Sequence, residues 1–291
     1  DSACIIPSVH ISAENVETIK EYTRKIAEEM HVCGLMNMQY AIENGKVFVL
    51  EANPRASRTV PLVSKVCNIR MVPLATDIIT SELTGRPSPV PNLKEQIIPN
   101  YGVKEAVFPF NMFQEVDPVL GPEMRSTGEV LGLSPYYGEA FCKAQEATQV
   151  KLPTEGTVLI SVNKKDKAEV VELAQMLADD GFDIIATSGT HQLISEAGIP
   201  SKKVKKLSEG RPNILDLITN GDIQLIINSP VGKDSVNDDS YLRKAAIKAK
   251  VPYFTTIAAA IATAKGIRYI KTHGNGEVKS LQELHSEIHD K

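Results

Sequence analysis

The spacing of apolar residues predicts a helix and then a β-hairpin near the start of the chain. Ser12 is a suitable helix N-cap, and the apolar residues behind it recur at helical spacing: Val16, Ile19, Ile26 and Met30. Residues 35–42 then alternate between apolar and polar, which is the period of a strand. Asn44-Gly45 is a strong hairpin-turn signal, and residues 47–52 supply the returning strand.

The middle of the chain is less regular. We expect a helix over residues 73–83, ended by Gly85, and a proline-rich surface loop over residues 86–100. Short extended segments follow up to residue 132, and a further helix is expected from about Tyr137 to Glu146.

The second half of the chain alternates between strand-like and helical patterns. The strand-like runs are residues 158–162, 183–187, 225–228 and 253–256, and the helical runs are residues 167–178, 191–197, 214–219, 241–249 and 257–265. Such alternation requires right-handed crossovers, which give a parallel sheet with helices on both faces. We therefore predict a mixed α/β chain with two domains, residues 1–150 and residues 151–291, divided near the polar stretch 148–155.

Composition excludes several classes of protein. The 291 residues include 32 basic and 36 acidic side chains, a net charge of −4 that argues against a general nucleic-acid surface. The longest apolar candidate runs from Thr255 to Ala264, too short for the roughly 18 residues of a membrane span. The four scattered cysteines lack metal or redox spacing, so we expect reduced thiols in a cytoplasmic protein. Because the chain begins with Asp1, we expect it to be a piece of a longer one.

The returning strand of the hairpin carries candidate chemistry at its end. Glu51 and Asn53 are two residues apart, so they share a face of the strand. A carboxylate beside an amide oxygen suits a hard cation such as Mg²⁺, and the neighbouring Arg55 and Arg58 suit phosphate oxygens. This pattern favours a phosphoryl-transfer site. Solvated or hydrogen-bonded loop residues would give the same pattern.

The hairpin geometry makes a further demand. A strict two-residue loop with regular pairing would turn Glu51 away from Gln39. We predict a three-residue loop over residues 43–45, which pairs Asn37 with Glu51, or a bulge with the same effect. Gln39, Glu51 and Asn53 would then share one face.

Two motifs resemble the large chain of carbamoyl-phosphate synthetases. The end of that family's second ATP-grasp half is similar to residues 34–39, GLMNMQ, and to residues 50–58, LEANPRASR. A second signature of the family resembles residues 121–130, GPEMRSTGEV, and the similarity runs through essentially the whole chain.

The resemblance implies that the chain is the C-terminal portion of a ligase. Such enzymes make carbamoyl phosphate for arginine and pyrimidine biosynthesis from bicarbonate, two ATP and ammonia that a glutaminase small subunit delivers, and this half phosphorylates carbamate. The resemblance assigns Gln39 and Glu51 to ATP and to Mg²⁺ or Mn²⁺, Asn53 to the metal, and Arg58 to the transferred phosphate. The family's nucleotide-binding strands and glycine-rich lid are expected upstream, so we expect this chain to be inactive alone and the full enzyme to be an oligomer.

In the second half, a strand runs into Ser188-Gly189-Thr190 and then into a helix. Such a turn offers backbone N–H groups and the positive helix end to an anion. Alternatively, Ser188 and Thr190 only cap a helix, and the lysines that follow form a solvated face: Lys202, Lys203, Lys205 and Lys206.

This half resembles the methylglyoxal-synthase-like regulatory domain of the same family. The resemblance implies an allosteric site for UMP or IMP built from Lys167, Thr187, Thr190, Lys206 and Asn228. Pro230 departs from the pattern, where a threonine contacts the ligand. An ornithine site would be built from Asp1, Glu105, Leu120, Tyr253 and Thr255. There Phe254 replaces an aspartate, so ornithine regulation is expected to be weak or lost.

Two other functions compete with the ligase portion. One is a lyase of the methylglyoxal-synthase type, but residues 228–234 lack the glycine-rich, aspartate-bearing loop of that enzyme, and the preceding 150 residues would stay unexplained. The other is a non-catalytic nucleotide-sensing module, which is how we expect the isolated chain to behave.

Overall fold

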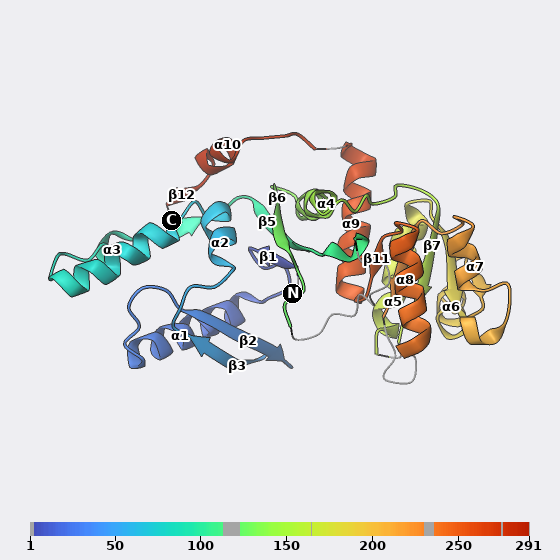
Figure 1. Cartoon of the computed structure of the whole chain (residues 1–291), viewed down its shortest axis with the longest axis horizontal. Coiled ribbons are helices and arrows are strands. Elements are labelled where there is room, and N and C mark those ends of the chain that lie inside the picture. Colours follow the sequence, from blue (N-terminus) through green and yellow to red (C-terminus); the bar gives the residue numbers. More distant parts are fainter. Residues whose placement is uncertain (1–2, 113–122, 164, 230–235, 275, 291) are drawn as a thin grey trace. The chain divides into compact units, whose positions relative to one another are not determined.

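The computed structural model describes residues 3–112, 123–163, 165–229, 236–274 and 276–290 (Figure 1). Its contacts divide the chain into two compact units. The first comprises residues 1–4 and 103–277, and the second comprises residues 5–102 and 278–291. The first unit holds a parallel sheet, and the second holds a hairpin with its helices.

The second unit is built around the predicted hairpin. Strands β2 (Asn37–Glu43) and β3 (Lys46–Asn53) form a two-stranded antiparallel sheet, and helix α1 (Ala13–Glu29) packs against it (Figure 1). Ser12 caps α1 as predicted, because its side chain accepts a hydrogen bond from the Asn15 amide. The Thr23 hydroxyl on α1 bonds the Tyr40 hydroxyl on β2 at 2.6 Å, so α1 covers the hairpin face that carries Tyr40.

The rest of this unit joins residues far apart in sequence. Helices α2 (Val60–Val66) and α3 (Met71–Thr84) pack together, and α3 ends at Gly85 in the left-handed conformation, as predicted. Residues 86–100 are mostly loop, yet β4 (Gln96–Ile97) pairs antiparallel with β12 (His289–Asp290). Helix α10 (Leu281–Ser286) joins α2 through a 2.6 Å bond between the His285 ring and the Lys65 carbonyl. The loop prediction missed this pairing, because its partner lies almost 200 residues away.

The first unit contains the predicted parallel sheet. Its five strands lie in the order β11-β10-β7-β8-β9, and every neighbouring pair is parallel. The strands are β7 (Thr157–Ser161), β8 (Asp183–Thr187), β9 (Lys202–Val204), β10 (Leu225–Asn228) and β11 (Tyr253–Phe254). The crossover helices are α5 (Lys167–Asp179), α6 (Ser188–Glu196), α7 (Ile214–Thr219) and α8 (Val236–Lys248), and α9 (Ile257–His273) follows β11 (Figure 1). The sheet is therefore doubly wound, with the chain leaving β7 in one direction and returning in the other.

Alternation along the strands separates two buried faces. Leu159, Ile185 and Ile226 are paired in register, and they pack in one cluster with residues of α7 and α8, including Ile218 and Leu242. Their strand neighbours face the opposite side, where α5 contacts both α6 and α9. Residues buried on both faces explain the continuous apolar runs in the sequence.

Helix α4 (Tyr137–Ala147) packs closely against both β6 (Gly128–Ser134) and α9, in the same unit. A Cβ on Gly138 would lie 2.8 Å from the Lys265 carbonyl oxygen, and a Cβ on Gly266 would overlap the Cys142 sulfur. Glycine is therefore required where the two helices cross.

Strands β1 (Cys4–Ile6), β5 (Tyr101–Val107) and β6 form a three-stranded sheet in the order β1-β5-β6. The domain boundary near residue 150 stays a prediction.

Three short 3₁₀ turns complete the described elements: η1 (Val90–Asn92), η2 (Pro109–Asn111) and η3 (Leu207–Glu209). All four cysteines lie within the described residues and are in the thiol form, as predicted. Burial, together with the nearby Glu146 and Glu139, raises the pKa of Cys142 to about 12, so this thiol is protonated at neutral pH. Among the described residues, no helix is both long enough and apolar enough to cross a membrane.

Candidate functional sites

A bulge in the hairpin decides which side chains share a face. Asn44 and Gly45 both have positive φ, 50° and 74°, and Glu43 pairs directly with Lys46, so the loop has two residues. The predicted three-residue loop is therefore wrong. Its alternative is confirmed, because the register shifts between Gln39 and Tyr40. This bulge absorbs one residue of β3, and Gln39 lies directly opposite Glu51.

The bulge gathers oxygen donors on one face of the hairpin. Gln39 pairs with Glu51, and the next pair on the same face, two residues away on each strand, is Asn37 with Asn53. The predicted pairing of Asn37 with Glu51 is therefore wrong. Directly opposed Cβ atoms lie about 5 Å apart in such pairs. Gln39 and Glu51 are exposed, and Asn37 and Asn53 are half-buried. One carboxylate with amide oxygens around it is a donor set that fits Mg²⁺ or Mn²⁺, which prefer oxygen ligands.

The two arginines after β3 have different surroundings. The Arg55 guanidinium donates to the carbonyl of Ala56, its own neighbour, at 3.0 Å. Arg58 is exposed and stands just before α2. A guanidinium next to a carboxylate and amide cluster can neutralise a phosphate oxygen.

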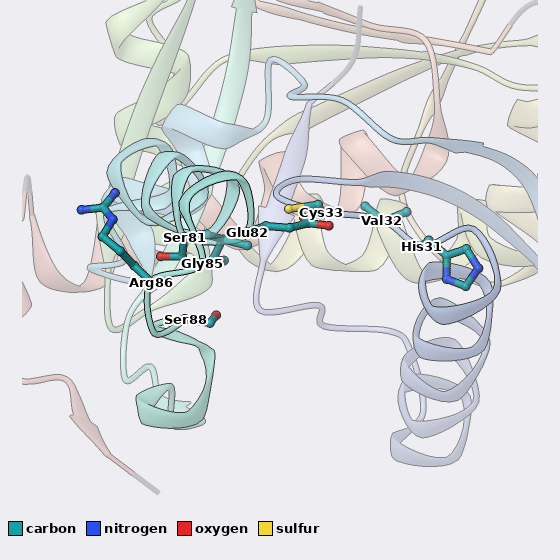
Figure 2. A pocket seen from close by; sticks show the side chains of 9 residues that line it. His31, Val32, Cys33, Ser81, Glu82, Gly85, Arg86 and Ser88 are labelled. Carbon is teal, nitrogen blue, oxygen red and sulfur yellow. The ribbon is translucent and has the colours of Figure 1, made fainter.

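A pocket of about 550 Å³ in the same unit lies away from these donors. Figure 2 shows Cys33 and Glu82 near its middle, whereas the His31 ring and the Arg86 guanidinium lie toward opposite ends and point away from each other. The hydrogen bond to Glu82 raises the pKa of the Cys33 thiol. No group of three or more His, Cys, Asp and Glu side chains in the described part of the chain could hold a metal ion.

A second polar cluster lies at the carboxyl edge of the parallel sheet. Asn228 ends β10 and pairs in register with Ser161, which ends β7. Thr187 ends β8, and its hydroxyl donates to the Ser161 hydroxyl at 3.1 Å. Asn228 and Thr187 are only 3% and 4% exposed, so this row of polar side chains is built into the fold. Ligands of open α/β sheets bind at this edge.

The start of α6 opens onto the same edge. Thr187 is the N-cap residue of α6, but its side chain makes no capping hydrogen bond, and its hydroxyl is directed to Ser161. The first amides of α6 are therefore not capped by that side chain, and they carry the positive end of the helix. The Thr190 hydroxyl accepts a hydrogen bond from the Val162 amide at 3.2 Å, and its own proton is available to donate. This arrangement suits an anion.

Two lysines extend this edge. Lys167 is half-buried at the first position of α5, and exposed Lys206 lies two residues after β9. Lys202 and Lys203 lie on β9 itself, which is the outer strand of the sheet. Lysines on an outer strand discourage pairing with another chain, which accounts for them without any ligand.

Comparison with known proteins finds two matching family models and several similar proteins. Residues 1–82 match the "Carbamoyl-phosphate synthase L chain, ATP binding domain" family, and residues 169–255 match the "MGS-like domain" family. The chain is 44% identical to a carbamoyl phosphate synthase large chain, C-terminal section, from Aquifex aeolicus, over 98% of this chain and 56% of that protein. A section of the same name from Methanopyrus kandleri is 47% identical, over 98% of this chain and 53% of that protein. Over nearly its whole length the chain is thus similar to C-terminal sections of carbamoyl phosphate synthase large chains.

The chain spans about half the length of these C-terminal sections, and only 26% of an undivided large chain from Acidobacterium capsulatum that is 46% identical to it. A solved structure described as "Crystal structure of ForH" matches 45% of the chain with 18% identity and a TM-score of 0.31, too weak a likeness to bear on the fold. The matched regions contain both the hairpin donors and most of the polar sheet edge.

The predicted ornithine site of the family is described only in part. Asp1 and Leu120 lie outside the described residues, as does Pro230. The carboxylate of Glu105 accepts hydrogen bonds from the Ala106 amide and the Gln145 side chain, and burial raises its pKa. Gln145 belongs to α4, and one helical turn earlier Phe141 contacts the Phe254 ring at 6.5 Å between centroids.

The remaining residues of the predicted ornithine site lie on or next to β11, where consecutive side chains point to opposite faces of the sheet. Phe254 faces α4, whereas the Tyr253 hydroxyl on the other face accepts a hydrogen bond from the Asn228 amide at 2.8 Å. Thr255 follows β11 directly. The structure thus joins Tyr253 to a member of the predicted nucleotide site.

Sequence reasoning missed three residues of these clusters. Asn37 alternates with Gln39 on β2, and that alternation was a usable signal. Ser161 was detectable as a small hydroxyl at the end of a buried strand. Asp239 on α8 accepts from the Asn228 amide at 3.0 Å, and nothing in the local sequence indicates that contact.

Proposed function

We propose that this chain is the C-terminal portion of a carbamoyl phosphate synthase large chain and serves an ATP-dependent ligase. In that role the hairpin face takes part in the phosphorylation of carbamate by ATP. The observation that carries the proposal is the direct opposition of Gln39 and Glu51, with Asn37 and Asn53 beside them on the same face.

The donor set supports binding of a divalent cation together with ATP phosphates. Glu51 supplies one negative charge, and Gln39 and Asn53 supply neutral oxygens, so they would hold Mg²⁺ or Mn²⁺ without cancelling its charge. When bound, the cation supplies positive charge to the phosphate oxygens. Arg58 would neutralise the phosphoryl group in transfer, where catalysis is mainly positioning and charge stabilisation.

The test uses the enzyme assembled from this chain, the preceding portion of the large chain and the glutaminase subunit. Glu51→Gln keeps the side-chain volume and removes the charge, so carbamoyl phosphate formation should fall by about a hundredfold or more. The bicarbonate-dependent ATPase of the other ATP-grasp half should survive. Glu43→Gln is the matched control, since Glu43 lies beside the turn opposite Lys46. Equal loss of both activities in Glu51→Gln would point to misfolding instead of a lost ligand, whereas undiminished carbamoyl phosphate formation would contradict the role of this carboxylate.

We infer that the parallel-sheet portion, residues 151–291, is a regulatory domain that binds a nucleotide such as UMP or IMP. Support comes from the first amides of α6, from the hydroxyl of Thr190, and from Lys167 and Lys206 at the same sheet edge. The amides and lysines would hold the phosphate. Asn228 and Thr187 would line the remainder of the site.

Calorimetry with UMP and with IMP tests this second role on the chain as it stands. Lys206→Ala should abolish the binding heat, whereas Lys203→Ala on the outer strand should leave it unchanged. No heat with either nucleotide at millimolar concentration would refute the regulatory role. Methylglyoxal formation from dihydroxyacetone phosphate would instead revive the lyase alternative.

The remaining expectations belong to the assembled enzyme. They are that the preceding portion of the large chain supplies the rest of the ATP site, that carbamate and ATP are the substrates, and that the glutaminase subunit delivers ammonia in the cytoplasm. Size-exclusion chromatography of this chain with those two partners would test the association directly.

A further inference from the structure

Asn228 is a buried polar side chain at the sheet edge that is held by two hydrogen bonds. It is 3% exposed, and its amide nitrogen donates two hydrogen bonds, at 3.0 Å to the Asp239 carboxylate and at 2.8 Å to the Tyr253 hydroxyl. A carboxylate can only accept, so the NH₂ group of the amide must face Asp239. Both N–H groups are therefore used within the protein. The carbonyl oxygen of Asn228 is the atom that remains to meet a ligand.

Strand register explains why Tyr253 reaches Asn228. Tyr253 pairs with Ile226, and Asn228 lies two residues further along the same strand. Residues two apart on a strand share a face, so Asn228 lies on the same face as Ile226, and Tyr253, which is paired with Ile226, points to that side too. Phe254 points to the opposite side, where it contacts Phe141.

The two contacts come from different elements and act together. Asp239 lies on α8 and Tyr253 on β11, so the amide is held from a helix and from a strand. Without the Tyr253 hydroxyl, Asp239 would still fix which way the amide faces, but the amide would swing more widely about its terminal torsion, which is intrinsically soft. A ligand would then have to restore the productive orientation at a cost in affinity.

We propose that Tyr253 is a positioning residue of the nucleotide site, acting through Asn228. The inference rests on the proposed regulatory function. It assigns to the Tyr253 hydroxyl a role in the affinity of the sheet edge for a nucleoside monophosphate. The hydroxyl itself need not touch the ligand.

The experiment is a double-mutant cycle measured by calorimetry with UMP and IMP on the full chain. Tyr253→Phe removes only the hydroxyl and should weaken binding by about two- to tenfold, the equivalent of one net hydrogen bond. In the Asn228→Ala background the same substitution should change the affinity by less than about twofold, because the group through which it acts is gone. Tyr241→Phe, on the exposed side of α8, is the matched control and should bind as the wild type does.

The outcomes separate the two proposals. If the wild type gives no heat with either nucleotide, the regulatory function fails and this inference fails with it. If the wild type binds and Tyr253→Phe binds equally well, or weakens binding by the same factor in both backgrounds, only the positioning role is refuted. Urea unfolding of each variant shows that it is folded at the titration temperature, and Asn228→Ser replaces Asn228→Ala as the background if the alanine variant does not fold.

Discussion

Replacing Asn228 by aspartate tests whether the Asn228 amide donates a hydrogen bond to Asp239. The substitution keeps the shape of the side chain but replaces the donating NH₂ group by an acceptor. The new carboxylate would face Asp239 at the present 3.0 Å, in a position that is 3% exposed. The contact with Tyr253 survives, because its hydroxyl can donate to a carboxylate. The predicted effect therefore comes almost entirely from the pair of like charges.

Two estimates bound the magnitude. Like charges 3.0 Å apart repel by about 5.5 kcal/mol at an effective dielectric constant of about 20. Protonating one carboxyl at about pH 7 avoids this repulsion and costs about 4 kcal/mol from an ordinary aspartate pKa of about 3.9. Protonation is the cheaper route, so the free energy of unfolding should fall by about 3–4 kcal/mol at about pH 7.

The loss of stability in Asn228→Asp should depend on pH in a definite direction. The new carboxyl has a pKa that is higher in the folded state than in the unfolded state, so its destabilisation is present at neutral pH and is relieved as the pH falls. At about pH 5 the loss should shrink to about 1.5 kcal/mol, at roughly 1.4 kcal/mol per pH unit. Urea unfolding followed by circular dichroism measures both values, and hydrogen exchange at the amides of Ile226 and Ile227 localises the effect to β10.

Asn220→Asp is the control, because Asn220 is exposed at the end of α7, and it should cost less than about 1 kcal/mol at either pH. A loss in Asn228→Asp that is below about 1 kcal/mol at neutral pH, or that is the same at both pH values, would mean that the amide does not donate to Asp239. The described orientation of Asn228 would then be incorrect.

Three further predictions concern other parts of the chain. Gly266→Ala should destabilise the first unit by about 1–2 kcal/mol in urea unfolding, because the overlap with Cys142 outweighs the gain in helix propensity. Adding Cys142→Ala should restore the stability, and a double variant that is no more stable than Gly266→Ala would contradict this packing. Burial raises the pKa of Glu105, so the wild type loses stability as the pH rises from the unfolded-state pKa, about 4, through the folded-state pKa; Glu105→Gln should therefore gain stability relative to the wild type over that rise, and a constant difference would refute the shift. Gly45→Ala places a side chain at a φ of 74°, should cost about 1–2 kcal/mol, and should weaken Mg²⁺ binding at the hairpin face as measured by calorimetry.

Most of the elements follow from local sequence. Ser12 and the apolar spacing after it define α1, and the alternation of apolar runs with helical patterns defines the parallel sheet. Asn44-Gly45 marks the turn because few residues tolerate positive φ at both positions. These signals act over a few residues, so they can be recognised without knowing what packs against them.

The candidate sites depended on pairing that no local pattern contains. Sequence alone left the order of the strands open. In the structure β10 lies between β7 and β11, which puts Asn228 in register with Ser161 and near Tyr253. The contact between Asn228 and Asp239 bridges a strand and a helix whose relative rotation is set by the core around Ile226 and Leu242. Such contacts are consequences of packing, which is why sequence spacing did not indicate them.

The sequence by itself determined the local elements, the doubly wound class of the second half, and the residue types that can hold a cation or an anion. Tertiary structure decided which of them meet. The β-bulge adds one residue to β3 and so puts Gln39 opposite Glu51. Side chains alternate with a period of two, so a shift of one residue reverses the face. The position of that bulge reflects how the whole strand fits its partner and the helix that covers it, and this balance is a property of the folded chain.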